Sequence, residues 1–323
     1  MLPRPLFMVV FGYRVWPLLK RTWQEVMEDN ILGLSAQTAY YFFFSLFPIF
    51  LFVAPLLSLI GDKEKVFGLL ITQLGSAVPG EAFALVRGVV NDVVFAENAP
   101  GLISVGALLA AWAGSNVFSA LIDAMNRAYD IEERRPWWKK KLVALTSVLV
   151  TGITVGLATT ILLSGEQIVN VVGNAIGLGP TAKALWTFLQ IPLALTMLVT
   201  ITALSFYFLP NLRPQSKKHV FAGALVTTAL WVLVTLGFRF YVLNFSNYNK
   251  TYGAVGGVIV LLTWMYLSML VFLIGGELSS ELQRGPGSVV PRSGTLYSGR
   301  IETSQSAKRT SDDRVDRLNP LPS

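Results

Sequence analysis

One arginine, Arg239, lies inside the apolar run TLGFRFYVLNF of residues 235–245. Counted along a helix from His219, it lies about 30 Å away, near the far edge of the hydrocarbon layer. An arginine at that depth either extends to water as an anchor or binds an anionic group with its planar guanidinium. Tyr252 lies near it in the sequence, and Glu166 is a candidate ion-pair partner. The second interpretation predicts a substrate site for an anionic amphiphile, such as a lipid headgroup, at Arg239 and Tyr252.

Other polar side chains also interrupt the apolar segments. With Arg239, the set is Gln37, Ser45, Asn116, Asn126, Gln190, Arg239 and Glu277. If these side chains face one cavity, they line a path for a transported substrate. If they do not, they serve as hydrogen bonds between membrane helices. Both interpretations stay open, and Asn126, Gln190 and Glu277 are candidate substrate-binding residues under the first.

Residue sets that metal enzymes and nucleotide motors use are missing. The chain has one histidine, His219, and no cysteine, so it offers neither a pair of histidines nor a thiolate set for a metal. It also lacks the G-x-x-x-x-G-K-[ST] phosphate loop. We therefore predict no metal, no cofactor and no catalytic residue.

A nuclease would have to use the carboxylates of the charged linker near residue 130, because RNA hydrolysis needs acid and base groups or metal ligands. Asp123 stands four residues before Arg127, which predicts an ordinary ion pair within one helix. Asp130, Glu132 and Glu133 share a short linker with two arginines. We predict no nuclease activity and no nucleic-acid partner.

Composition indicates the elements that hold these residues. The chain has 323 residues, of which 53% are apolar and 14% are charged, far fewer than the roughly one quarter of a soluble domain. Six charge-free windows reach the roughly 18 to 20 residues that cross hydrocarbon as a helix. They are Asn30–Gly61, Asn98–Ile122, Leu142–Gly165, Ala184–Leu212, Val220–Phe238 and Thr251–Gly276. The sequence predicts an all-α polytopic membrane protein with six transmembrane helices.

Lysine and arginine are concentrated before the first span and after the second and fourth, so both termini are predicted to be cytoplasmic. The net charge of +7 is largely this topology signal. We predict an interfacial helix within 1–30, a transmembrane domain at 31–283 with an amphipathic outer loop at about 62–98, and a disordered tail at 284–323. In the first segment Leu19, Trp23, Val26 and Met27 are expected on one apolar face.

Two further patterns predict contacts with lipid and between helices. The run ERRPWWKKK predicts headgroup contact through Trp137, Trp138, Lys139, Lys140 and Lys141. Small residues at helical spacing predict close helix packing at Gly253, Gly256 and Gly257, and again at Gly152 and Gly156.

Four blocks of sequence resemble the YihY/BrkB family of bacterial inner-membrane proteins. They are AQTAYYFFFSLFPIF, LIDAMNRAYD, FYFLPN and YNKTYGAVGGVIVLLTWMYLSMLVFLIGGEL. The resemblance covers about residues 20–284 and implies six spans, cytoplasmic ends and an inner-membrane location. It adds Tyr129 to the candidate substrate-binding residues and supports Asn126, Tyr252 and Glu277. Members of this family have been labelled ribonuclease BN, virulence factors and lipid-related transporters.

The residues and the resemblance together predict transport or flipping of a lipid-like or anionic amphiphile, with membrane lipids as partners. A membrane scaffold without transport is the alternative, and an enzyme acting on RNA is the third class. The oligomeric state is not predicted by any pattern in the chain.

Overall fold

The computed structural model describes residues 9–10, 13–60, 62–65, 67–68, 71–72, 87–88, 90–92, 94–95, 99–175, 179–212, 215–245 and 248–284. The chain divides into two compact units, Met1–Gln283 and Arg284–Ser323. Beyond Arg284, the predicted tail lies outside the described residues. So does most of the predicted amphipathic loop at 62–98, although short pieces of it are helical and Val90 and Val94 are buried.

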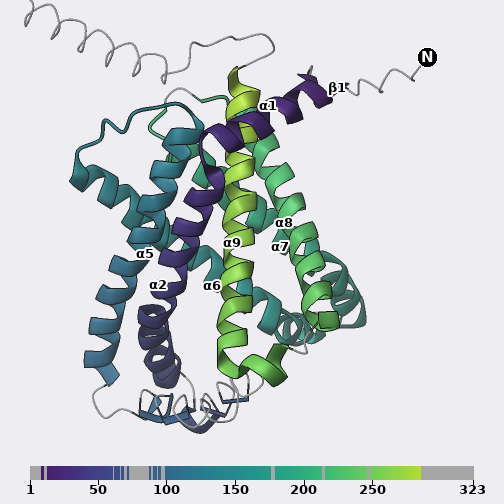
Figure 1. The fold of residues 1–323 in the computed structure, drawn as a ribbon. Coiled ribbons are helices and arrows are strands. Elements are labelled where there is room, and N and C mark those ends of the chain that lie inside the picture. The colour runs from purple at the N-terminus through teal and green to yellow at the C-terminus, as the bar shows by residue number, and fades with distance from the viewer. Residues whose placement is uncertain are drawn as a thin grey trace, which may run out of the picture. The chain divides into compact units, whose positions relative to one another are not determined.

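Helices make up nearly all of the described chain (Figure 1). They are α1 (Val15–Glu28), α2 (Ile31–Ile60), α5 (Ala99–Ala128), α6 (Trp137–Ala175), α7 (Gly179–Phe208), α8 (Lys217–Phe245) and α9 (Tyr248–Arg284). Two short strands, β1 (Val9–Val10) and β2 (Tyr13–Arg14), pair antiparallel before α1. Within the described residues, six helices are long and apolar enough to cross a membrane. The prediction of an all-α protein with six spans is confirmed.

Helix α1 crosses the end of the bundle at which α9 finishes (Figure 1). The chain turns between α1 and α2 at Asn30, whose φ of 54° is a left-handed conformation that asparagine tolerates. Trp16, Trp23 and Met27 are exposed on α1, as an interfacial helix requires. Val26, predicted on the same apolar face, is buried in the core.

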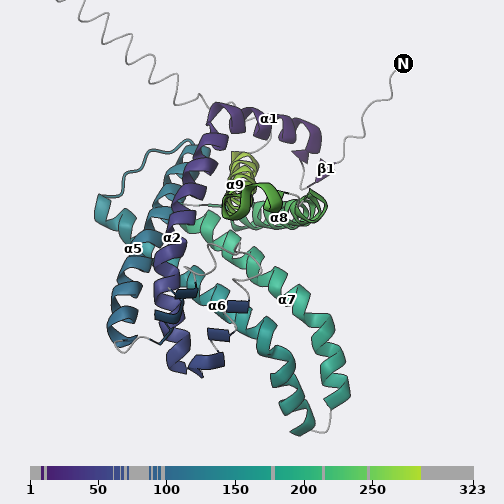
Figure 2. The ribbon, with the colours of Figure 1, turned by 60° about the horizontal axis from the view of Figure 1, so that its bottom comes forward.

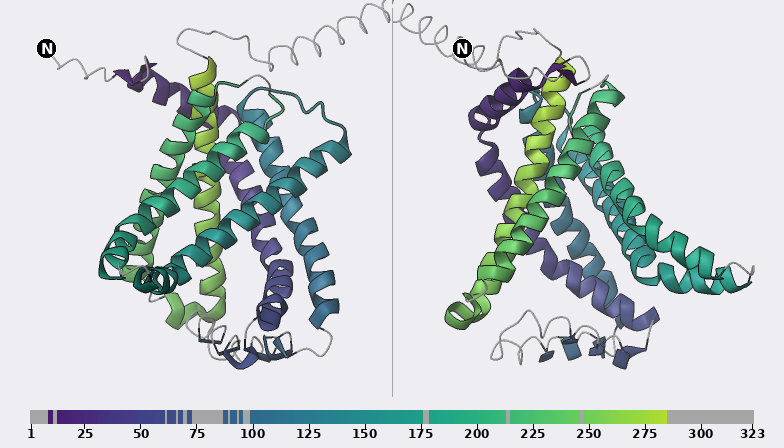
Figure 3. Two further views of the ribbon diagram at one scale, coloured as in Figure 1. Left: turned by 180° about the vertical axis from the view of Figure 1, so that it is seen from behind. Right: turned by 90° about the vertical axis from the view of Figure 1, so that its right-hand side faces the viewer.

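The spans pack most tightly at one end. We call this the basic end; it carries residues 127–141, 209–212 and 215–219. The large buried side chains near it are Ile122, Met125, Phe206, Leu209 and Leu273. Toward the other end, α6 and α7 run side by side and diverge from α8 and α9 (Figures 2 and 3). Phe188 on α7 is 76% exposed and Ile153 on α6 is 63% exposed. Apolar faces of this kind are suited to contact with lipid.

Two glycines for which no packing role was predicted permit close helix contacts. A Cβ on Gly106 of α5 would lie 2.8 Å from the Leu51 carbonyl oxygen of α2, and one on Gly275 of α9 would collide with Thr227 of α8. A Cβ on Gly152 or Gly156 would meet nothing within 4 Å among the described residues, so within this part of the chain they do not make the predicted close helix contact. On α9, Gly256 is buried and Gly257 is half-buried. The structure does not describe the surroundings of Gly253.

Candidate functional site

All six spans contribute to a cavity in the middle of the bundle, which we call the central cavity. Its volume is about 270 Å³, and apolar side chains such as Phe42, Leu121 and Phe272 form much of its wall. Its polar lining consists of hydroxyl and indole groups from α6 to α9: Thr151, Thr202, Ser205, Thr227, Thr228, Trp231 and Ser268. A mainly apolar wall with a few hydroxyls is typical of a pocket that takes a hydrophobic ligand.

Most of these hydroxyls are already hydrogen-bonded within the protein. Thr202 Oγ1 donates to the Leu198 carbonyl at 2.9 Å, and Ser268 Oγ accepts a bond from Trp231 Nε1 at 3.1 Å. Thr228 differs, because its buried Oγ1 has no hydrogen-bond partner in the described parts of the chain. A buried hydroxyl without a partner is costly, so Thr228 provides a polar contact for a molecule in the cavity.

A second cavity, the α6/α7 groove, extends from the central cavity toward the basic end. Its volume is about 570 Å³, and it shares the lining residues Thr151, Ile201 and Ser205 with the central cavity. Its walls are mainly apolar, and its end near the α5–α6 connection is lined by Arg135 and Asn211. The two cavities are therefore adjacent, with Thr151, Ile201 and Ser205 between them.

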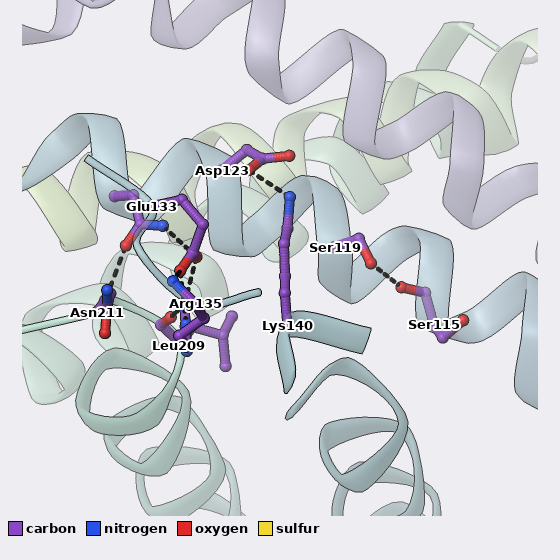
Figure 4. Close-up of polar contacts among 9 residues, drawn as sticks. Ser115, Ser119, Asp123, Glu133, Arg135, Lys140, Leu209 and Asn211 are labelled. Carbon is purple, nitrogen blue, oxygen red and sulfur yellow. Dashed lines mark hydrogen bonds and ion pairs between the residues drawn. The ribbon is translucent and has the colours of Figure 1, made fainter. Parts of the chain in front are cut away.

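A polar network fixes the basic end of this groove (Figure 4). Asn126 Nδ2 donates to Glu133 Oε2 at 2.8 Å, and its Oδ1 accepts the Asn211 amide hydrogen at 2.8 Å. Arg135 donates to Glu133 through Nε at 2.8 Å and Nη2 at 2.7 Å, and to the Leu209 carbonyl at 2.8 Å. The network joins the end of α5, the α5–α6 connection and the end of α7.

The charge state of Glu133 follows from these contacts. Burial by itself raises the pKa of this carboxyl group, but the hydrogen bonds and charge of Arg135, together with the Asn126 amide, outweigh burial and lower the pKa overall. Glu133 is therefore ionised at neutral pH and holds the Arg135 guanidinium in place through a bidentate pair.

Tyr129 forms a second buried polar contact, between the end of α5 and α9. Its hydroxyl donates to Ser279 Oγ at 3.0 Å and accepts a bond from Gln283 Nε2 at 3.2 Å. Burial raises the pKa of Tyr129 to about 12, and the negative charge of Glu277 adds to this effect. Tyr129 is therefore a neutral hydrogen-bond donor at physiological pH.

Replacing Tyr129 by phenylalanine is expected to change the alkaline stability of the protein. The pKa of the Tyr129 phenol is about 12 in the folded state and 10.0 in the unfolded state, so the folded state holds the proton more tightly. The stabilisation that this proton gives to the folded state is complete below pH 10 and is lost as the pH rises through about 12. Thermal unfolding in detergent should show a smaller decline between pH 10 and 12 for Tyr129→Phe than for the parent. Tyr40→Phe, at a side chain that is 57% exposed, is the control and should follow the parent. An unchanged slope for Tyr129→Phe would contradict the assignment.

Comparison with known proteins identifies the family. A family model described as virulence factor BrkB matches residues 22–292. The chain belongs to this family. The predicted resemblance is thereby confirmed over most of the chain.

Three bacterial relatives of this BrkB-family protein span a range of names. YfkH of Bacillus subtilis (strain 168), whose name describes it as ribonuclease-like, is 30% identical over 251 residues, covering 77% of this chain and 89% of YfkH. A UPF0761 membrane protein of Tolumonas auensis is 24% identical over 263 residues, covering 80% of this chain and 83% of the relative. A UPF0761 membrane protein of Alteromonas mediterranea is 26% identical over 266 residues, covering 79% of this chain and 84% of the relative. No solved structure matches the chain.

The predicted substrate-binding residues of this BrkB-family protein fall into two groups. Asn126, Tyr129 and Glu277 are buried near the basic end. Arg239 is exposed on α8 and Gln190 is half-buried on α7. The structure does not describe the side chains of Tyr252 and Glu166. The structure therefore does not bring together the five whose side chains it describes.

The cavity lining also differs from the predicted path. Of the polar set singled out in the sequence, Gln37 is exposed, Ser45 bonds its own helix, and no member lines the central cavity or the groove. Serines and threonines line them instead, together with Arg135. Sequence reasoning missed these residues because a hydroxyl in a membrane helix normally bonds the preceding turn and carries little signal of function.

Charged residues at the basic end of this BrkB-family protein have partners other than the predicted ones. Asp123 pairs with Lys140 at 2.6 Å, and Arg127 lies 3.8 Å from Asp29, so the predicted Asp123–Arg127 pair is wrong. Lys141 donates to Asn116 at 2.8 Å and lies 4.3 Å from the centre of the Trp112 ring.

These partners limit the predicted headgroup contacts. Trp137, Trp138 and Lys139 are exposed, and their contact with headgroups stays a prediction. Lys140 and Lys141 are half-buried and bonded within the protein, which the sequence did not predict.

Proposed function

We propose that this protein moves a lipid-like, anionic amphiphile across the bacterial inner membrane through the central cavity. The observation that carries the proposal is the cavity itself, which lies where all six spans meet and has an apolar wall with a few hydroxyls. The α6/α7 groove adjoins it, so a chain-like molecule in the groove would lie next to the central cavity.

The uneven packing of the bundle supports transport over scaffolding alone. The spans are tightly packed at the basic end, while α6 and α7 diverge from α8 and α9 toward the other end (Figure 3). The concentration of lysine and arginine supports a cytoplasmic location for the basic end. A bundle closed on one side and spread on the other is the arrangement that alternating access requires, in which one helix bundle moves against another around a central site.

The contacts of the acidic side chains favour transport over RNA hydrolysis, despite the ribonuclease-like name of YfkH. Glu133 is held by Arg135 and Asn126, and Asp123 is held by Lys140. A carboxylate bound to a cation is poorly placed to activate water or bind a metal. No group of three metal-binding side chains occurs among the residues that the structure describes.

Filling the central cavity tests the proposal. Thr202→Phe places a ring in the cavity, and Thr200→Phe places the same ring on the exposed side of α7. The two threonines are matched, since each hydroxyl bonds the carbonyl four residues earlier in the same helix. We expect Thr202→Phe to slow movement of fluorescent phosphatidylglycerol across reconstituted vesicles by about tenfold, equivalent to about 1.4 kcal/mol in the barrier.

The rate is measured as the loss of protected fluorescence after a membrane-impermeant reductant is added to one side of the vesicles. Thr200→Phe should match the parent. Both variants should first elute as the parent does in detergent and unfold at a similar temperature. If the parent moves the labelled lipid no faster than protein-free vesicles, transport of this class is contradicted and the scaffold function is favoured.

A further inference from the structure

The α6/α7 groove has the depth of one membrane leaflet. Its lining on α6 runs from Leu142 to Thr151, which corresponds to a rise of about 14 Å. Half of the hydrocarbon layer measures about 15 Å. A groove that begins at the basic end therefore reaches approximately the middle of the membrane, where the shared residues Thr151, Ile201 and Ser205 border the central cavity.

The groove is amphipathic along its length. Apolar side chains line most of its wall, and Arg135 with Asn211 lines its basic end. Of the five N–H donors that an arginine carries, Arg135 uses one on Nε and two on Nη2, for Glu133 and Leu209. The two N–H groups on Nη1 have no partner among the described residues and are available to an anionic oxygen.

The groove also borders the surface that lipid covers. Leu142, Leu204 and Phe208 line it, and their side chains are 58%, 38% and 47% exposed. A molecule can enter from the side without crossing the packed basic end. In a bilayer the molecules beside such a surface are lipids, whose chains match the apolar wall and whose phosphates lie at headgroup depth.

We infer that the α6/α7 groove binds an anionic glycerophospholipid of the leaflet at the basic end, with one acyl chain between α6 and α7 and the phosphate at Arg135. Glu133 holds the guanidinium in position and balances its charge, so a phosphate without an acyl chain binds weakly. Binding at the groove does not depend on transport. Only the onward step, in which the lipid passes into the central cavity, rests on the proposed function.

Photochemical labelling tests the site directly. The full-length protein is placed in phosphatidylcholine vesicles with a small fraction of phosphatidylglycerol that carries a diazirine in one acyl chain. Peptide mass spectrometry then locates the adducts. We expect them to concentrate on residues 142–151 and 201–212, and the same diazirine chain on uncharged diacylglycerol should label these residues much less.

Two variants on α6 form a matched pair for this experiment. Ser147 and Thr154 each donate to the carbonyl four residues earlier, at 2.8 and 2.7 Å, but only Ser147 lines the groove. Ser147→Trp should reduce labelling by about tenfold, and Thr154→Trp should leave it unchanged. Arg135→Gln should remove the preference for phosphatidylglycerol over diacylglycerol.

The proposed binding site would be contradicted if the adducts were spread evenly over the lipid-facing surfaces of the spans and if Ser147→Trp did not change them. Equal labelling by phosphatidylglycerol and diacylglycerol would overturn the role of Arg135. Thr202→Phe should still be labelled at the groove because Thr202 lines only the central cavity. Loss of transport and loss of groove binding are therefore separate results.

Discussion

Replacing Asn126 by leucine is expected to lower the free energy of unfolding by about 3 kcal/mol, because two hydrogen bonds of a buried side chain are lost at once. Asn126 is 3% exposed, and its amide joins Glu133 to the backbone of Asn211. Leucine would leave the Asn211 N–H and one oxygen of the ionised Glu133 without this partner. Denaturant or thermal unfolding of the purified protein in detergent measures the loss.

Gln37→Leu is the control for this prediction, since it also replaces a polar side chain in a span but at an exposed position. It should change stability by no more than about 0.5 kcal/mol. A double-mutant cycle with Glu133→Gln separates the network from simple packing, because residues in one network give non-additive losses. Stability of Asn126→Leu equal to that of Gln37→Leu would contradict the role of the network.

The positions of the spans along the chain could be predicted from the sequence because each span depends on a long, local run of apolar residues. Each charge-free window corresponds to one observed helix, as Leu142–Gly165 does to α6. Some helices extend beyond their windows: α6 begins at Trp137 and continues to Ala175. Hydropathy detects the part of a helix in hydrocarbon, whereas backbone hydrogen bonding continues past the membrane surface.

The partners of the charged residues could not be predicted because they depend on the tertiary fold. The rule for pairs four residues apart favoured Asp123 with Arg127. The observed partner, Lys140, is seventeen residues away and is brought close by the turn between α5 and α6. Asn126 likewise meets Asn211 across 85 residues. Sequence spacing on one helix contains no information about which neighbouring helix lies opposite.

The glycine pattern shows the same limit. Gly152 and Gly156 have the spacing of a packing motif, yet their side of α6 is exposed. Gly106 has no glycine partner four residues away, yet it makes the close contact between α5 and α2. Spacing identifies a surface that allows close approach, but only the fold determines whether another helix occupies it.

Pro55 explains why a backbone carbonyl of α2 lies close to Gly106 of α5. In a regular helix the N–H of residue 55 would donate to the carbonyl of Leu51, but Pro55 has no N–H to give. That carbonyl is the group nearest to Gly106, at 2.8 Å from the position a Cβ would occupy. The glycine allows α5 to approach this carbonyl closely, because it has no side chain to keep the two backbones apart.

Gly106→Val is therefore expected to destabilise the protein by about 3 kcal/mol, because the new side chain meets backbone that cannot rotate away. The Cβ would also lie 2.9 Å from both the Leu51 carbonyl carbon and the Phe52 nitrogen, so α2 and α5 must separate. Gly152→Val makes the same substitution in a span where a Cβ meets nothing within 4 Å among the described residues. It should be neutral or slightly stabilising, since valine exceeds glycine in helix propensity by a few tenths of a kcal/mol. Unfolding of the two variants side by side in detergent measures the difference, and equal stability would mean that α2 and α5 do not pack through Gly106.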